Sequence, residues 1–157
     1  MSDRGLTHLD PLGRARMVDV SGKPETVREA TAEAIVTLAS ATRQAVFAGD
    51  LPKGEARSVV RLAAIMGAKR TADIVPLCHP IELSAVEADI QETGTGARIE
   101  VRVRTTGRTG VEMDALTGAA LGAIALYDMG KGLDRGAEIG PVRLLHKAGG
   151  RSGEWRR

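Results

Sequence analysis

The segment from Lys69 to Pro80 combines the side chains that acid–base and phosphate chemistry requires. It contains two cations, a carboxylate, a thiol and an imidazole. Pro76 and Pro80 fix their own φ angles and restrict the residues before them to extended backbone. His79 can bind a phosphate or move a proton near neutral pH, or it can be an ordinary capped loop histidine. The rigid setting favours a small-molecule site.

Asp128 and Lys131 form a second candidate pair for proton transfer. They are three positions apart and therefore share one side of an expected helix. In one interpretation they are an exposed ion pair that contributes little to stability. In the other, their pKa values are shifted by each other and by burial, so that they exchange protons at neutral pH. The residues alone leave both interpretations open.

Several cations could complete a site for a polyanion such as a triphosphate, if the fold gathers them. Each one taken alone is more often a solvated surface residue. The sequence has no Walker loop and no dinucleotide fingerprint, which argues against an ordinary NTPase or dehydrogenase. The single cysteine, Cys78, cannot build the usual structural zinc site and is interpreted as a small packed residue. The cations lie at expected element ends or beside glycine: Arg28, Lys53, Lys69, Arg70, Lys131 and Lys147.

Composition sets the class of protein. The 157 residues carry a net charge of +2 and only 2% aromatic residues, which argues against a protein that binds nucleic acid by charge or by base stacking. The longest apolar stretch, residues 119–126, is far shorter than a membrane span. We expect one cytoplasmic domain over residues 1–157, with flexible ends at 1–14 and 148–157 and no membrane partner.

The elements that must position these residues follow from periodicity. A capping box at Thr26–Glu29 and apolar residues every three or four positions predict a helix to about Ala48. Apolar residues that alternate with polar or charged ones predict a β-hairpin over residues 83–106. The mixed order indicates an α+β fold, a sheet with helices packed on it. Further predicted elements are a strand-like piece at 16–20, helices at 54–69 and 112–131, and a strand at 139–147. The residues expected to be buried are, on the first of those helices, Ala56, Val59, Val60, Ala63, Met66 and Gly67, and on the second, Met113, Leu116, Leu121, Ile124 and Tyr127.

Many short motifs, in one order along nearly the whole chain, resemble the MoaC family, the cyclic pyranopterin monophosphate synthases of molybdenum cofactor biosynthesis. Any single motif would be weak, whereas the ordered set is specific. The motifs are Leu6–Asp10, Met17–Ser21, Thr26–Ala30, Lys53–Gly54, Ala68–Thr71, Pro76–Pro80, Gly110–Met113, Ala115–Thr117, Tyr127–Met129 with Lys131, and Lys147 before Gly149–Gly150.

The resemblance implies a reaction without metal or cofactor. The cyclised dihydro-GTP intermediate would be rearranged into a pyranopterin that carries a cyclic phosphate, with release of pyrophosphate. It implies a ferredoxin-like subunit and a homo-oligomer, a trimer of dimers, with the site between subunits. It also implies that Asp128 is the acid–base residue, with Lys131 and Lys53 beside it. Substrate would be bound by Leu77, Cys78, His79, Glu112, Met113, Arg28, Lys69 and Lys147.

The chain departs from the family pattern at several places. Arg108 and Arg151 replace usual lysines and keep the charge. Glu55 stands where the family usually has aspartate, and Gly130 replaces the usual small residue between Asp128 and Lys131. Two glycines, Gly130 and Gly132, are expected to loosen the end of that helix. The alternative to an enzyme is a catalytically silent module that binds a nucleotide or phosphate, and the retained Asp128 and its lysines argue against it.

Overall fold

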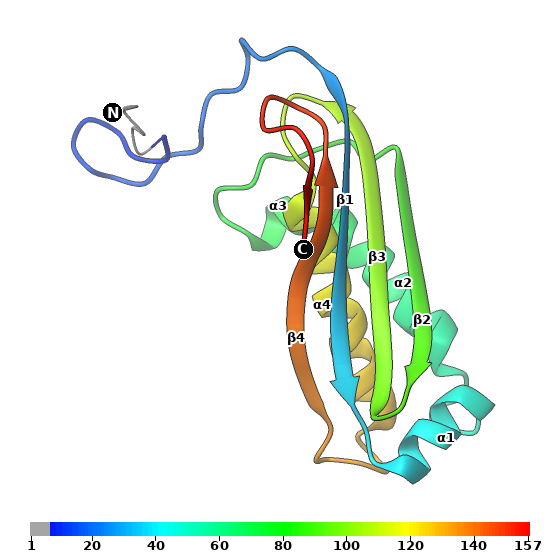
Figure 1. The fold of residues 1–157 in the computed structure, drawn as a ribbon. Coiled ribbons are helices and arrows are strands. Elements are labelled where there is room, and N and C mark those ends of the chain that lie inside the picture. The colour runs from blue at the N-terminus through cyan, green and yellow to red at the C-terminus, as the bar shows by residue number, and fades with distance from the viewer. Residues whose placement is uncertain (1–6) are drawn as a thin grey trace.

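The computed structural model describes residues 7–157 as one antiparallel sheet with helices on one face (Figure 1). The five strands lie in the order β2-β3-β1-β4-β5. In chain order the elements are β1 (Thr26–Thr37), α1 (Ser40–Ala48), α2 (Ala56–Lys69), α3 (Thr71–Ile74), β2 (Ala85–Thr93), β3 (Gly96–Gly107), α4 (Glu112–Gly130), β4 (Glu138–Ala148) and β5 (Trp155–Arg156). None of the helices within residues 7–157 is long and apolar enough to cross a membrane.

The predicted α+β, ferredoxin-like fold is confirmed. Ignoring the short α1 and α3, the order β1-α2-β2-β3-α4-β4 is the split β-α-β pattern of ferredoxin-like folds. The hairpin, the last strand and the helices from 54 and from 112 are confirmed within a few residues. The tail after Ala148 returns along β4 as β5, and the expected flexible end at residues 1–14 lies partly outside the described residues.

The helix predicted over residues 26–48 is wrong in its first half, where the chain forms the central strand β1. Ala30, Ala32, Ala34 and Val36 also alternate with period two, and all four are buried against the helices. Alanine favours helix, but pairing with β3 on one side and β4 on the other overrides that local preference. The strand expected at residues 16–20 is also wrong, because the chain forms no strand there.

The helices turn their smallest residues inward, so the predicted buried stripes are partly wrong. A Cβ added at Gly67 on α2 would lie 2.8 Å from Leu121, and one at Gly118 on α4 would lie 2.9 Å from the Ala64 carbonyl oxygen. This close approach leaves large apolar side chains outside. Those at least 40% exposed are Val59, Leu62, Met66, Met113 and Ile124.

The opposite face of the sheet carries ion pairs around one buried carboxylate. Glu33 on β1 accepts hydrogen bonds from Arg98 on β3, at 2.5 Å, and from Arg143 on β4, at 2.7 Å. The Glu33 side chain is only 5% exposed. Burial by itself would raise the pKa of Glu33, but the two arginine hydrogen bonds outweigh it and hold that pKa below its ordinary value. One carboxylate thus ties three neighbouring strands together.

Replacing Glu33 with glutamine should lower the free energy of unfolding by about 3 kcal/mol, because two arginines then lose their buried partner. The contribution of Glu33 is present at neutral pH and is lost as pH falls through its lowered pKa. Urea denaturation at pH 7 measures the effect. Glu87→Gln, at a carboxylate that is 72% exposed on the same face, is the control and should change stability little.

Candidate active site

The predicted site residues form two groups at opposite ends of α4. Glu112 and Met113 begin the helix, and Asp128 lies in its last turn. Sixteen residues separate Glu112 from Asp128, which in an α-helix is about 24 Å. One chain therefore cannot close both groups around one small molecule.

The first group is a carboxylate held between two lysines. Lys53 Nζ lies 2.6 Å from one carboxylate oxygen of Asp128, and Lys131 Nζ lies 2.7 Å from the other. Lys53 reaches Asp128 from the loop before α2. Glu55, which stands where the family usually has aspartate, caps α2 by accepting hydrogen bonds from the backbone N–H groups of Arg57 and Ser58. The longer Glu55 side chain thus fixes the helix beside Lys53.

The hydrogen bonds from Lys131 and Lys53 lower the pKa of Asp128 to about 2. The pKa of Lys131 is raised, chiefly by its hydrogen bond to Asp128. The Asp128 side chain is 52% exposed. Burial opposes the pKa shifts of Asp128 and Lys131, and their mutual hydrogen bonding outweighs it. At neutral pH Asp128 is ionised, but a carboxylate with so low a pKa is a weak base while both lysines hold it.

Gly130 does not interrupt α4. The helix continues through Gly130, and the Lys131 backbone N–H donates to the Tyr127 carbonyl at 2.8 Å. A Cβ at Gly130 would lie 3.4 Å from Thr42 Cγ2, so the position has room only for a small side chain. The lysine that follows is therefore presented by regular helix geometry.

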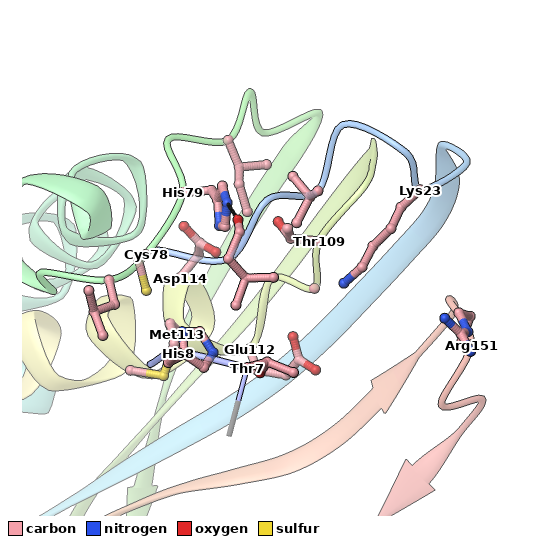
Figure 2. Close-up of a pocket in the computed structure, with 15 residues that line it drawn as sticks. Thr7, His8, Lys23, Cys78, His79, Thr109, Glu112, Met113, Asp114 and Arg151 are labelled. Atoms are coloured by element: carbon pink, nitrogen blue, oxygen red, sulfur yellow. Dashed lines mark hydrogen bonds between the residues drawn. The ribbon is translucent and has the colours of Figure 1, made fainter. Parts of the chain in front are cut away.

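The second group lines a pocket of about 430 Å³ at the N-terminal end of α4 (Figure 2). Five predicted substrate-binding residues line it: Leu77, Cys78, His79, Glu112 and Met113. Burial raises the pKa of the Cys78 thiol, with a further contribution from Asp114, so the thiol stays protonated and fits the packed interpretation.

The chain before β1 orients His79. Its Nε2 lies 2.6 Å from the Val18 carbonyl oxygen, the contact drawn as a dashed line in Figure 2. A carbonyl can only accept, so Nε2 carries a proton and donates it. In the neutral imidazole Nδ1 is then the acceptor that remains for a ligand.

Asp114 is the site residue that the sequence analysis missed. It is only 6% exposed and lines the pocket beside Cys78. Burial raises its pKa to about 6. In the sequence, Asp114 lies one helical turn before Gly118 and therefore on the same side of α4. The small residues on that side face inward. That side was not recognised because large apolar residues were expected there.

Replacing Asp114 with asparagine should stabilise the fold at pH 7.5 and weaken function. A carboxyl whose pKa rises from 3.8 to about 6 on folding binds its proton more tightly in the folded state. Ionisation above pH 6 therefore costs the folded state up to about 3 kcal/mol. We expect a higher melting temperature for Asp114→Asn at pH 7.5 and a smaller gain at pH 5. Thermal denaturation at the two pH values checks this, and an equal gain at both would contradict it.

The three cations that were predicted to bind phosphate have different surroundings in the structure. Lys147 Nζ lies 2.9 Å from a Glu112 carboxylate oxygen and 2.7 Å from Ser152 Oγ. Arg28 donates to the carbonyl oxygens of Gly107 and Arg108, at 2.9 and 3.0 Å. Lys69 lines a separate hollow between α2 and β2. The structure thus brings Lys147 to the pocket wall through Glu112, and it does not bring Lys69 there.

Known proteins similar to this chain agree in name and cover nearly all of it. The family model described as MoaC family matches residues 17–150. A cyclic pyranopterin monophosphate synthase of Thermomicrobium roseum is 54% identical over 97% of this chain and 93% of the relative. Proteins with the same name from Roseiflexus sp. and Parvibaculum lavamentivorans are each 50% identical over 99% of this chain, and over 98% and 99% of their own lengths.

Proposed function

This chain belongs to the MoaC family, and we propose that it converts the cyclised dihydro-GTP intermediate into cyclic pyranopterin monophosphate with release of pyrophosphate. It is a lyase of molybdenum cofactor biosynthesis. The observation that carries the proposal is the carboxylate of Asp128 held between Lys53 and Lys131, in a chain about half identical to synthases over nearly its full length. We place the reaction in the cytoplasm, in a single domain, without a metal or cofactor.

Asp128 and its two lysines are the proposed proton-transfer group. Ionised Asp128 accepts a proton from a substrate hydroxyl or ring position as bonds rearrange. Lys53 or Lys131 donates one to the ring that opens. Binding of a highly anionic substrate competes for the lysines and loosens their hold on Asp128. That release would raise the pKa of Asp128 from its value in the free chain.

The pocket at the other end of α4 is the proposed binding site for the nucleotide. Met113 and Leu77 offer apolar surface to the ring system. Ionised Asp114 can accept hydrogen bonds from the N–H groups of the guanine-derived ring, and Nδ1 of His79 can accept another. Holding the ring so that its own α-phosphate faces the new hydroxyl is a proximity effect.

A complete site requires two copies of the chain. The two groups are about 24 Å apart along α4, so Asp128 of one chain must meet the pocket of another. Large apolar side chains exposed on α2 and α4 support such an assembly. We propose the family's trimer of dimers, with the site between subunits, and no nucleic-acid or membrane partner.

Incubation with the cyclised dihydro-GTP intermediate tests the function. We expect equimolar pyrophosphate and, after oxidation, a fluorescent pterin. Binding of the intermediate without either product would favour the silent binding module. Absence of both binding and products would overturn the proposal.

A further inference from the structure

Lys53 reaches Asp128 from a separate loop, whereas Lys131 reaches it from the end of the helix that carries Asp128 itself. Lys131 follows Asp128 by three positions, so helix geometry alone brings the two together. Lys53 is 75 positions away along the chain. Its ammonium nevertheless lies 2.6 Å from the carboxylate, on a side chain that is about half exposed to solvent. The backbone of the loop must therefore supply the position of Lys53.

The loop forms a β-turn with Lys53 at its third position. The Gly54 backbone N–H donates to the Leu51 carbonyl at 2.8 Å, which closes the turn over Pro52 and Lys53. Pro52 fixes its own φ angle at the second position of the turn, where proline is favoured. Leu51 is buried, so the first residue of the turn is anchored in the core. The backbone that precedes Lys53 therefore has little freedom.

The backbone that follows Lys53 depends on Glu55. Gly54 has a φ angle of +91°, in a region where glycine moves freely, so this residue alone would let the chain turn in several directions. The Glu55 carboxylate restricts it by accepting from the backbone N–H groups of Arg57, at 2.9 Å, and Ser58, at 2.7 Å. Hydrogen bonds from the side chain and backbone of Ser58 lower the pKa of Glu55 to about 2, so this cap is ionised at neutral pH.

We propose that Glu55 is a positioning residue for the reaction, because its cap on α2 holds the turn that keeps the Lys53 ammonium on Asp128. This inference rests on the proposed function, in which Lys53 takes part in proton transfer. Without the cap, the turn would be anchored only through Leu51, and the Lys53 side chain would move toward solvent. Asp128 would then keep only Lys131 of its two lysines. A misplacement of about 1 Å is enough to slow a reaction strongly.

Competitive acetylation of the assembled protein with acetic anhydride, measured by mass spectrometry at each lysine, tests the inference without turnover. Glu55→Ala should raise the labelling of Lys53 relative to Lys131 about threefold, a factor typical of the loss of a surface ion pair. Lys131 is the internal control, because a general loosening of the protein would expose both lysines alike. Glu55→Asp supplies a preferred capping side chain and should restore the wild-type ratio.

Arg57→Gln is the matched control. Arg57 Nε lies 3.1 Å from a Glu55 carboxylate oxygen, so the substitution removes this charged partner and keeps both backbone donors of the cap. The labelling ratio and kcat/KM should both stay within a factor of about two of the wild type. An equal effect in Arg57→Gln and Glu55→Ala would assign the effect to the ion pair and overturn the role of the cap.

Kinetics with the cyclised intermediate separate this inference from the function itself. Glu55→Ala should lower kcat/KM at least about tenfold, and Glu55→Asp should regain most of the loss. A wild-type labelling ratio in Glu55→Ala would overturn the positioning role, and so would a raised ratio with unchanged kcat/KM. A raised ratio in Glu55→Ala, together with a wild type that makes no product, would keep the hold of Glu55 on Lys53 and overturn the function.

Discussion

Replacing Asp128 with asparagine should lower kcat/KM by at least about a thousandfold, because the amide keeps the shape of the carboxylate but cannot take up a proton at neutral pH. It also loses the charge that holds Lys53 and Lys131 on either side. The fold should be unaffected, since the side chain is half exposed and its ion pairs are at the surface. Release of pyrophosphate and formation of pterin give the rate, and the melting temperature gives the stability.

Asp50→Asn is the matched control for this experiment. Asp50 is an exposed aspartate in the loop that carries Lys53, and it takes part in no ion pair among residues 7–157. It should retain wild-type turnover within a factor of about two. A loss of less than tenfold in Asp128→Asn would mean that another group transfers the proton.

Mixing two inactive variants should restore activity if each site is built from two chains. Asp128→Asn removes the proton acceptor at one end of α4, and His79→Ala damages the pocket at the other end. In a mixed dimer, one of the two sites receives both substitutions and the other receives neither. Random pairing makes half of the dimers mixed, so activity should recover to about one quarter of that of the wild type.

The control mixture pairs Asp128→Asn with Lys53→Met. Both changes lie in the same group of one chain, so every site in a mixed dimer carries one of them and activity should stay low. Co-expression with two different tags and purification through both would supply mixed oligomers of known composition. Verified mixed oligomers of Asp128→Asn with His79→Ala that stay inactive would contradict a site shared between chains.

The sequence predicted the fold class because alternation in residues 83–106 and the long 112–131 helix are strong local signals. β1 was not predicted because an alanine-rich segment satisfies periods of two and of 3.6 at once, and partners far along the chain decide between them. The buried sides of α2 and α4 were predicted only in part: Ala56, Val60 and Gly67 are buried as expected, whereas Val59, Met66 and Ile124 are exposed. Size usually indicates burial, whereas here glycine and alanine face inward so that the helices can approach closely.

The site was predicted as a set of residues but not as an arrangement. Motifs identified Asp128 with its lysines and the residues around His79, and the structure places each group together. The predicted helix over residues 112–131 already places Glu112 and Asp128 at opposite ends, but sequence spacing could not reveal which other segments meet each end. Nor could it show that Lys147 is paired with Glu112, because ion pairing depends on contacts between distant segments.

The close glycine and alanine contacts between α2 and α4 bear on the stability of a single subunit in the cell. A helix interface made of the smallest side chains buries little apolar area for each residue, so we expect an isolated subunit to be less stable than the assembly. Association would supply the missing stability by mass action, and a diluted protein would lose shape and activity together. Subunits without partners would then be open to proteolysis, which couples the amount of working enzyme to the rate at which chains are made.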